Sequence, residues 1–313
     1  MTSSSSFALA IHGGAGVIER DQLGAEEEAA IRADLDRALD AGHAVLRDGG
    51  SALDAAQAAV VALEESPRFN AGKGAVYDAD GRHELDASLM DGRTRGAGAV
   101  AGVTTVRNPI KLAREVMEHS PHVLLIGAGA ERFADTRTGI ERVPNDWFDT
   151  EVRHAQLLET QARECAEADA ANLKGKYFGT VGAVARDMHG YLAAATSTGG
   201  MTNKKWGRVG DSPLIGCGTW ADESCAVSGT GWGEFFIRNA VAHDIAARMA
   251  YRGDTLQAAA DAVILQRVPE LGGDGGAIAI DAQGNIALPF NTTGMYRGWI
   301  AMDGSRGTAI FRD

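Results

Sequence analysis

Thr180 combines a nucleophilic side chain with an unusual place in the chain. It follows Gly179, at the point where a long charged stretch gives way to the small and β-branched residues 181–185. A threonine hydroxyl is a weak nucleophile, and a free α-amino group is one base that can activate it. That amine has an ordinary pKa of about 7.7–8.0, so part of it is neutral near pH 7. Cleavage between Gly179 and Thr180 would therefore create a nucleophile with its own base, although the same threonine could simply open a β-strand.

Hydroxyl and charged residues further along the chain could complete such a site. Thr198 ends a segment that a turn at 187–190 should fold back beside Thr180. Arg208 and Asp211 follow in a loop rich in glycine and proline. The guanidinium could bind an α-carboxylate through two parallel hydrogen bonds while the carboxylate binds the α-ammonium group of the same amino acid. The alternative is a surface salt bridge between the two, contributing about 0–1 kcal/mol.

The segment 228–234 offers a place for developing negative charge. Its sequence, Ser-Gly-Thr-Gly-Trp-Gly-Glu, ends an apolar strand pattern where a helical pattern begins. Backbone N–H groups at the start of a helix carry partial positive charge. We therefore interpret this segment as a candidate oxyanion hole.

Three further motifs suggest other chemistry less strongly. The glycine-rich segment 12–16 lacks the Lys-Ser/Thr end of a P-loop. Gly127-Ala128-Gly129 follows an apolar run as in a dinucleotide site, but Arg132 stands where a third small residue is needed; dinucleotide binding is kept as the alternative from a different functional class. His83-Glu84-Leu85-Asp86 lacks the i, i+4 histidine pair of a zinc protease, which favours the polar edge of a hairpin.

The elements around these residues predict an α+β fold. A strand is expected at 7–11, and helices at 25–47, 51–65, 109–117, about 150–173, 234–251 and 256–267. Residues 182–193 and 276–287 share one pattern, an apolar run that meets an Asp-x-x-Gly turn, and 74–81 begins in the same way. Such turns make antiparallel hairpins. We therefore expect two stacked antiparallel sheets with helices outside, and a helix followed by a mobile linker at 159–176.

Composition restricts the partners. The chain has 313 residues, 45% of them hydrophobic, and a formal net charge of −12, which argues against nucleic acid and anionic membrane surfaces and favours a small-molecule substrate. The first residues lack the features of a secretory signal, and no segment reaches the length of a membrane span, so a cytoplasmic location is expected. Cys165, Cys217 and Cys225 are read as free thiols.

Several ordered motifs together resemble the plant-type L-asparaginase and isoaspartyl peptidase family of N-terminal-nucleophile hydrolases. The resemblance spans essentially the whole chain. The motifs are 11–16 (IHGGAG), 69–72 (FNAG), 83–87 (HELDA), 179–185 (GTVGAVA), 196–201 (TSTGGM), 207–213 (GRVGDSP), 229–231 (GTG) and 288–292 (LPFNT).

The resemblance implies a single domain, 1–313, with a four-layer αββα sandwich that cuts itself into an α subunit, 1–179, and a β subunit, 180–313. The mature enzyme would hydrolyse L-asparagine and β-aspartyl dipeptides through a covalent β-aspartyl-threonine intermediate, and two αβ units would pair. No cofactor is expected for catalysis. A structural sodium ion is expected on the backbone carbonyls of Leu63, Glu64, Ser66, Phe69, Ala71 and Lys73.

The family also implies a role for each site residue. Thr180 would be nucleophile and, through its amine, base, with Thr198 assisting it and Asn70 close by. The remaining roles would be an oxyanion hole from Thr230 and the Gly231 N–H, and an aspartyl clamp from Arg208, Asp211 and the carbonyl of Gly233.

Trp232 departs from the small or polar residue that we expect at this position in the family. If its ring projects into the cleft, it should favour apolar leaving groups; the alternative is packing in the core. Within the same superfamily, a glycosylasparaginase-like or protein-processing hydrolase is the nearest rival function.

Overall fold

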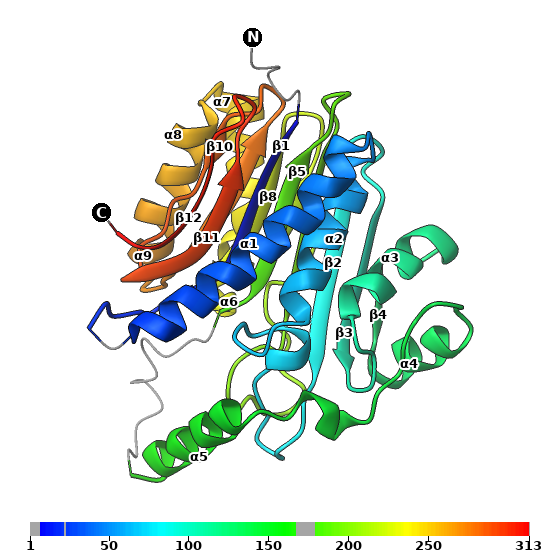
Figure 1. Cartoon of the computed structure of the whole chain (residues 1–313), viewed down its shortest axis with the longest axis vertical. Coiled ribbons are helices and arrows are strands. Elements are labelled where there is room, and N and C mark those ends of the chain that lie inside the picture. Colours follow the sequence, from blue (N-terminus) through cyan, green and yellow to red (C-terminus); the bar gives the residue numbers. More distant parts are fainter. Residues whose placement is uncertain (1–6, 22, 167–178, 313) are drawn as a thin grey trace.

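Two stacked β-sheets lie between two layers of helices (Figure 1). The computed structural model describes residues 7–21, 23–166 and 179–312. Residues 167–176 of the helix and linker expected at 159–176, together with residues 177 and 178, fall outside these ranges. The expected α+β sandwich of two sheets flanked by helices is confirmed.

The larger sheet has the strand order β12-β11-β1-β5-β6-β2-β3-β4, and the smaller has β10-β9-β8-β7. Neighbouring strands are antiparallel except for the pair β3 and β4 at one edge. The bounds in the larger sheet are β1 (Ala8–Gly16), β2 (Leu85–Asp91), β3 (Ala97–Val103), β4 (Leu124–Ile126), β5 (Val181–Arg186), β6 (Leu192–Thr198), β11 (Gly294–Ile300) and β12 (Arg306–Phe311). Those in the smaller sheet are β7 (Thr219–Ala221), β8 (Cys225–Gly231), β9 (Gly275–Asp281) and β10 (Ile286–Ala287).

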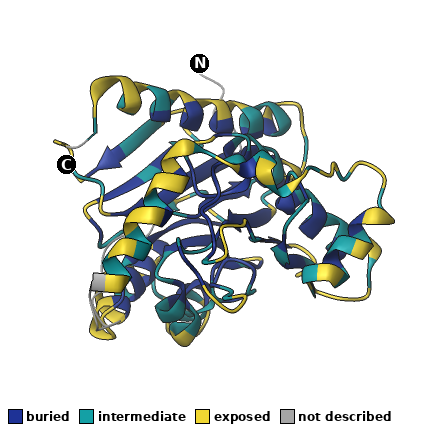
Figure 2. Ribbon diagram, turned by 90° about the horizontal axis from the view of Figure 1, so that it is seen from below, coloured by how far each residue is buried: buried dark blue, intermediate teal, exposed yellow. Residues whose placement is uncertain are grey.

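Each sheet buries its outer face under helices. The larger sheet is covered by α1 (Ala25–Arg47), α2 (Ala52–Glu64) and α3 (Pro109–His119), and the smaller by α7 (Val241–Arg252) and α8 (Leu256–Asp261). The other helical segments are α4 (Gly127–Asp135), α5 (Glu151–Ala166), α6 (Gly233–Asn239), α9 (Val268–Glu270), the short turns Gly72–Gly74 and Asn145–Phe148, and a π-helical turn at Ala262–Arg267. Helices expose their outer sides and bury their inner sides (Figure 2).

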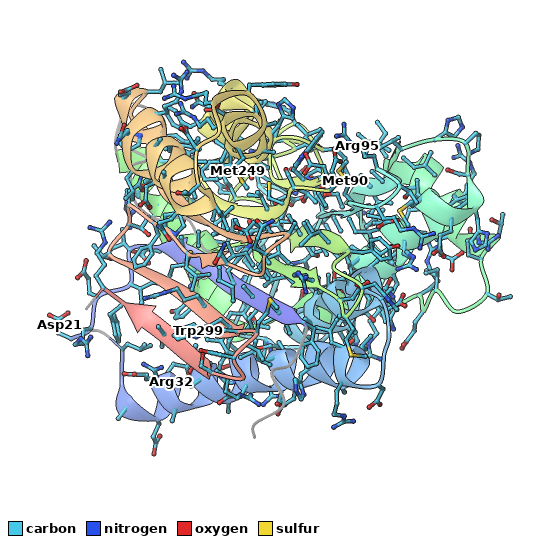
Figure 3. All side chains as sticks on the ribbon, turned by 90° about the horizontal axis from the view of Figure 1, so that it is seen from above. Asp21, Arg32, Met90, Arg95, Met249 and Trp299 are labelled. Atoms are coloured by element: carbon cyan, nitrogen blue, oxygen red, sulfur yellow. The ribbon has the colours of Figure 1, made fainter. Side chains whose placement is uncertain are left out.

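Three hydrophobic clusters fill the spaces between the four layers. Figure 3 shows side chains packed between α1 on one side of the molecule and α7 and α8 on the other. The cluster between the sheets contains many small residues, such as Ala8, Ala10 and Ala194. Small side chains let the two sheets approach closely, and the same region admits the buried polar groups of the site.

The sequence expectations need three corrections. The strand expected at 7–11 is longer, because residues 12–16 continue β1 as a buried strand past a bulge. Residues 74–81 form no strand hairpin: the turn at Asp78 is present, because its Oδ1 accepts from Asp80 and Arg82 N–H, but a helical turn precedes it. The helix expected at 234–251 breaks at Ala240, which has a left-handed φ of 47°. Within the described residues, no helix is long and apolar enough to cross a membrane.

Candidate active site

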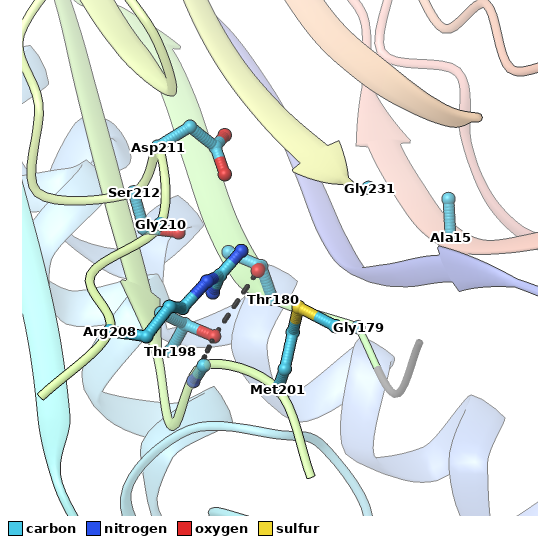
Figure 4. Close-up of a pocket in the computed structure, with 11 residues that line it drawn as sticks. Ala15, Gly179, Thr180, Thr198, Met201, Arg208, Gly210, Asp211, Ser212 and Gly231 are labelled. Atoms are coloured by element: carbon cyan, nitrogen blue, oxygen red, sulfur yellow. Dashed lines mark hydrogen bonds between the residues drawn. The ribbon is translucent and has the colours of Figure 1, made fainter. Parts of the chain in front are cut away.

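Thr180 stands immediately before β5 and beside the end of β6. The hairpin that joins these strands pairs Val181 with Ser197, so the next residues, Thr180 and Thr198, are neighbours. The Thr180 hydroxyl donates to the Thr198 hydroxyl at 3.2 Å, and Thr198 Oγ1 also accepts from the N–H of Gly200 at 3.0 Å (Figure 4). The adjacency that the turn at 187–190 predicted is therefore present.

Thr230 brings a third hydroxyl from the smaller sheet. It lies in β8, fully buried, and its Oγ1 accepts from the N–H of Thr180 at 3.4 Å and from that of Ala15 at 3.2 Å. The next residue, Gly231, has a φ of 154°, and a Cβ there would lie 2.4 Å from the carbonyl oxygen of Asp274. Only glycine fits this position, so no side chain at residue 231 covers the backbone beside Thr180 and Thr230.

Thr180 and Thr198 line a cavity whose empty volume, open solvent included, is about 330 Å³. Figure 4 shows Arg208 and Asp211 on the same side of this cavity, facing the region of Thr180. The lining residues are Ala15, Gly179, Thr180, Thr198, Gly200, Met201, Arg208, Gly210, Asp211, Ser212 and Gly231.

Arg208 has its ion-pair partner in Glu234, which the sequence reasoning did not identify. Its Nε and Nη2 atoms donate to the two carboxylate oxygens, each at 2.8 Å. Burial opposes the charge of Arg208, but the bonds to Glu234 outweigh it and raise the pKa of the guanidinium. Glu234 lies in the first turn of α6, where an acidic residue is favoured. This preference for an acidic residue is the one sequence feature that could have indicated Glu234 as the partner. The ion pair holds the guanidinium of Arg208 beside the cavity.

Asp211 is a buried carboxylate with room for a cation. Asp211 is only 4% exposed, and its Oδ2 atom makes no hydrogen bond with the described residues. Burial raises the pKa of Asp211 to about 7, although the nearby charge of Arg208 acts in the opposite direction. A buried, unpaired oxygen of this kind is costly unless a ligand satisfies it. An ammonium group in the cavity would supply the missing donor.

Gly233 makes room for both members of this clamp. A Cβ on Gly233 would lie 2.7 Å from Nη2 of Arg208 and 3.0 Å from Oδ1 of Asp211. Asn70, which the family resemblance places near the catalytic threonine, is not among the residues that line the cavity. Its Nδ2 donates to the carbonyl of Gly200 at 2.7 Å, so it supports the turn that follows Thr198.

Trp232 caps α6 and is half-buried, outside the residues that line the cavity. Its ring packs edge-on against Phe235, with centroids 4.9 Å apart, and its side chain donates a hydrogen bond to Glu234. The indole is thus connected to Arg208 through Glu234. Neither of the two sequence interpretations, contact with the leaving group or simple core packing, includes this connection.

His12 is a second residue that sequence reasoning missed. It is fully buried in β1, and its Nδ1 lies 2.9 Å from the carbonyl oxygen of Thr180. Burial lowers the pKa of His12 to about 3, against the raising effect of that hydrogen bond. The ring is therefore neutral near pH 7. Because 168 positions separate the two residues in the chain, no local motif could have indicated the contact.

The other two candidate motifs lie outside the residues that line this cavity. His83 bonds to the carbonyl of Val76 and to Asp149, and the described residues contain no group of three or more His, Cys, Asp or Glu side chains that could hold a metal ion. Gly127 begins α4 after the edge strand β4, whose parallel partner is β3.

The two-sheet sandwich with this threonine at the start of a central strand defines an N-terminal-nucleophile type of hydrolase. The chain belongs to the asparaginase family, whose model matches residues 5–310. It is 53% identical over 309 residues to the isoaspartyl peptidases of Salmonella typhimurium and Escherichia coli, covering 97% of this chain and 98% and 96% of theirs. It is also 42% identical to the human isoaspartyl peptidase/L-asparaginase over 289 residues, covering 92% of this chain and 91% of the relative.

Proposed function

We propose that this protein hydrolyses β-aspartyl dipeptides and L-asparagine and releases L-aspartate. The observation that carries the proposal is the shared cavity: Thr180 and Thr198 stand 3.2 Å apart at one side, and Arg208 and Asp211 line the same space. A substrate with an α-carboxylate, an α-ammonium group and a side-chain amide matches these three chemistries. The names and identities of the relatives support the same reaction.

In the proposed mechanism, the chain first cuts itself between Gly179 and Thr180. The Thr180 hydroxyl attacks the carbonyl of Gly179, an ester replaces the peptide bond, and water hydrolyses the ester to leave a free α-amine on Thr180. This amine remains near Thr230, whose Oγ1 lies 3.4 Å from the Thr180 nitrogen in the structure. It can then accept the proton of the adjacent hydroxyl.

Catalysis follows with the same hydroxyl. Arg208 binds the substrate α-carboxylate and Asp211 the α-ammonium group, with the carbonyl of Gly233 as a further acceptor, so that the side-chain carbonyl faces Thr180. Attack forms a β-aspartyl ester and expels ammonia or the second amino acid, which takes the proton held by the amine. Thr230 and the N–H of Gly231 stabilise the oxyanion. Water then hydrolyses the ester and releases aspartate.

The decisive experiment combines mass and product analysis. The wild-type protein should give two fragments of 179 and 134 residues, counted from the cut between Gly179 and Thr180, and should release aspartate from β-aspartyl dipeptides. Thr180→Ala should stay whole and inactive, while Thr180→Ser should retain part of both activities. A whole wild-type chain with full activity would refute the role of Thr180. A glycosylasparaginase-like reaction predicts instead that a glycosylated asparagine is the preferred substrate, which the same assay can measure.

We also propose a structural sodium ion in the loop 63–73. A Cβ on Gly72 would lie 2.3 Å from the carbonyl oxygen of Glu64, and one on Gly74 would lie 2.1 Å from that of Phe69, so carbonyls crowd against these glycines. The carbonyls of Phe69 and Ala71 each accept one backbone N–H among the described residues and keep a second lone pair, while that of Leu63 accepts from Ser66 and Glu65. Oxygen ligands of this kind suit a hard cation. The melting temperature should be higher in sodium chloride than in choline chloride of equal ionic strength.

Pairing of two αβ units and a cytoplasmic location complete the proposal. The described surface exposes large apolar side chains on α5 and β4, namely Val152, Leu158 and Ile126, which supports a protein contact there. The three cysteines of this protein are free thiols, which suits the reducing conditions of the cytoplasm. Light scattering of the purified protein and fractionation of the source cells test these two points.

A further inference from the structure

A chain of buried hydroxyl groups runs between the two sheets, starting at His12. The Nε2 atom of His12 lies 2.9 Å from Ser228 Oγ, and Ser228 Oγ lies 2.7 Å from Thr196 Oγ1. Thr219 Oγ1 continues the chain at 2.6 Å from Thr196 Oγ1, and Ser88 Oγ lies 2.8 Å from Thr219 Oγ1.

This series of hydroxyl groups connects two parts of the proposed site, the nucleophile Thr180 and the loop that carries Asp211. At one end, Nδ1 of His12 bonds to the main-chain carbonyl of Thr180 at 2.9 Å. At the other, Ser88 Oγ donates to the main-chain carbonyl of Ser212 at 2.6 Å, directly after the Asp211 of the clamp. His12, Ser88, Thr196, Thr219 and Ser228 are all fully buried. Buried polar groups of this kind fix one geometry, because any displacement leaves a donor or acceptor unsatisfied.

The packing of the sheets leaves space for this chain. A Cβ on Gly182 would lie 2.0 Å from Ser228 Oγ and 2.4 Å from His12 Nε2, so any larger residue on β5 would displace both groups. The backbone ladder of β1 and β5 is paired from Ala8 to His12 and ends at Gly182, two residues after Thr180. The His12 ring therefore replaces the main-chain pairing that Thr180 lacks on this side.

We propose that His12 is a positioning residue and that its hydroxyl chain keeps the main chain of Thr180 and the loop of Asp211 and Ser212 in register. The inference rests on the proposed function. The carbonyl of Thr180 can only accept, so Nδ1 of His12 carries the proton and donates it. The Nε2 atom of the neutral ring then accepts from Ser228, Ser228 from Thr196 and Thr196 from Thr219. The single proton of the Ser88 hydroxyl is shared between Thr219 Oγ1 and the carbonyl of Ser212. Thr219 is far along the sequence from His12 but only seven positions after Ser212, whose carbonyl its hydroxyl also approaches at 3.4 Å, and it lies in the middle of the connection.

Thr219 offers matched variants for the test. Thr219→Val keeps the shape and removes the hydroxyl, whereas Thr219→Ser keeps the hydroxyl and removes a methyl group. We expect Thr219→Val to lower kcat and raise KM for L-asparagine, with a combined loss of about 3- to 10-fold in kcat/KM, in line with one lost hydrogen bond. Thr219→Ser should stay within about twofold of the wild type. Thr292→Val is the control, because the Thr292 hydroxyl is also buried and donates to a main-chain carbonyl, that of Gly294.

Two further measurements make the outcome decisive. In a double-mutant cycle with Ser228→Ala, the losses should be less than additive, because the first substitution already interrupts the chain. Additive losses, or an equal loss in Thr219→Ser, would overturn the proposal. Nitrogen NMR of labelled His12 does not depend on activity: a proton on Nδ1 at pH 7 is expected, and an unprotonated Nδ1 would overturn the proposal even in an active enzyme. An inactive wild type with Nδ1 protonated would refute the proposed function alone.

Discussion

Replacing Asp211 by asparagine should make the folded protein more stable relative to its parent as the pH rises. The substitution keeps the shape of the side chain and removes its charge. It is best made in the Thr180→Ala background, which should remain one uncut chain, so that both proteins unfold as one polypeptide. The prediction depends on the burial of Asp211 and on its Oδ2 atom, which has no hydrogen-bonding partner among the described residues.

The size of the effect follows from the pKa. Burial raises the pKa of Asp211 from 3.8 to about 7 in the folded protein. The shift is about three units, each worth ~1.4 kcal/mol, so the ionised group destabilises the fold by about 4 kcal/mol above pH 7. Since the folded pKa lies above the unfolded one, this penalty is complete above pH 7, shrinks as the pH falls, and disappears below about 3.8.

The asparagine amide adds a cost of its own. Its NH₂ group would occupy a buried position without an acceptor, which costs about 1–3 kcal/mol at any pH. The cost of the buried amide does not depend on pH. The difference in unfolding free energy between variant and parent should therefore change by about 3–4 kcal/mol between pH 4 and pH 8, whatever the size of that cost. This pH-dependent part isolates the charge of Asp211.

Urea unfolding at pH 4, 5, 6, 7 and 8 measures the difference directly. Asp281→Asn is the control, because Asp281 is as buried as Asp211 but accepts hydrogen bonds from Gln283 and Asn285. Its replacement should destabilise the protein at pH 8. A difference for Asp211→Asn that is constant from pH 4 to pH 8 would show that the carboxylate is not held at a raised pKa, and would refute the account of the empty clamp.

Three predictions concern the other side of the clamp and the nucleophile. Arg208→Ala should raise KM for L-asparagine by about 10- to 100-fold, from the loss of about 1.5–3 kcal/mol, and leave self-cleavage nearly intact; unchanged kinetics would place Arg208 outside the substrate site. Trp232→Phe should raise KM about two- to fivefold by removing the hydrogen bond to Glu234, with the ratio of rates for β-Asp-Phe and β-Asp-Lys unchanged; a changed ratio would place the indole at the leaving group. Thr198→Val should slow both self-cleavage and turnover, measured by intact mass and aspartate release, whereas Thr198→Ser should restore most of both rates.

Local patterns in the sequence were sufficient for the elements and for part of the site. The helix at 25–47 was predicted with its observed bounds, because its apolar period is regular and Gly49-Gly50 follows it. The pairing of Thr180 with Thr198 could be predicted because one short turn connects their strands. By contrast, the strand expected from the pattern at 74–81 was wrong, because the Asp turn has the same signature whether or not strands flank it.

Contacts between elements that are distant along the chain could not be predicted from the sequence. The partner of Arg208 is Glu234, 26 positions away, and only the approach of α6 to the loop after β6 selects it over Asp211. His12 meets Thr180 because β1 and β5 pair in one particular register, which a sequence without a structure does not fix. Such positions are chosen by the packing of sheets, where a change of one residue in register would move each side chain to the opposite face.

The contacts of Thr180 are those that the proposed cut would need if the new chain terminus is to stay ordered. A new chain terminus normally frays unless other contacts fix it. Three groups of Thr180 are each held by a different strand: the carbonyl by His12 of β1, the hydroxyl by Thr198 of β6 and the nitrogen by Thr230 of β8. The contacts of the carbonyl and the hydroxyl do not involve the peptide bond to Gly179, and the nitrogen that Thr230 holds is the atom that the proposed cut would turn into an amine. The proposed cleavage would therefore remove one covalent restraint and add a basic amine, while His12 and Thr198 would still hold the carbonyl and the hydroxyl of Thr180.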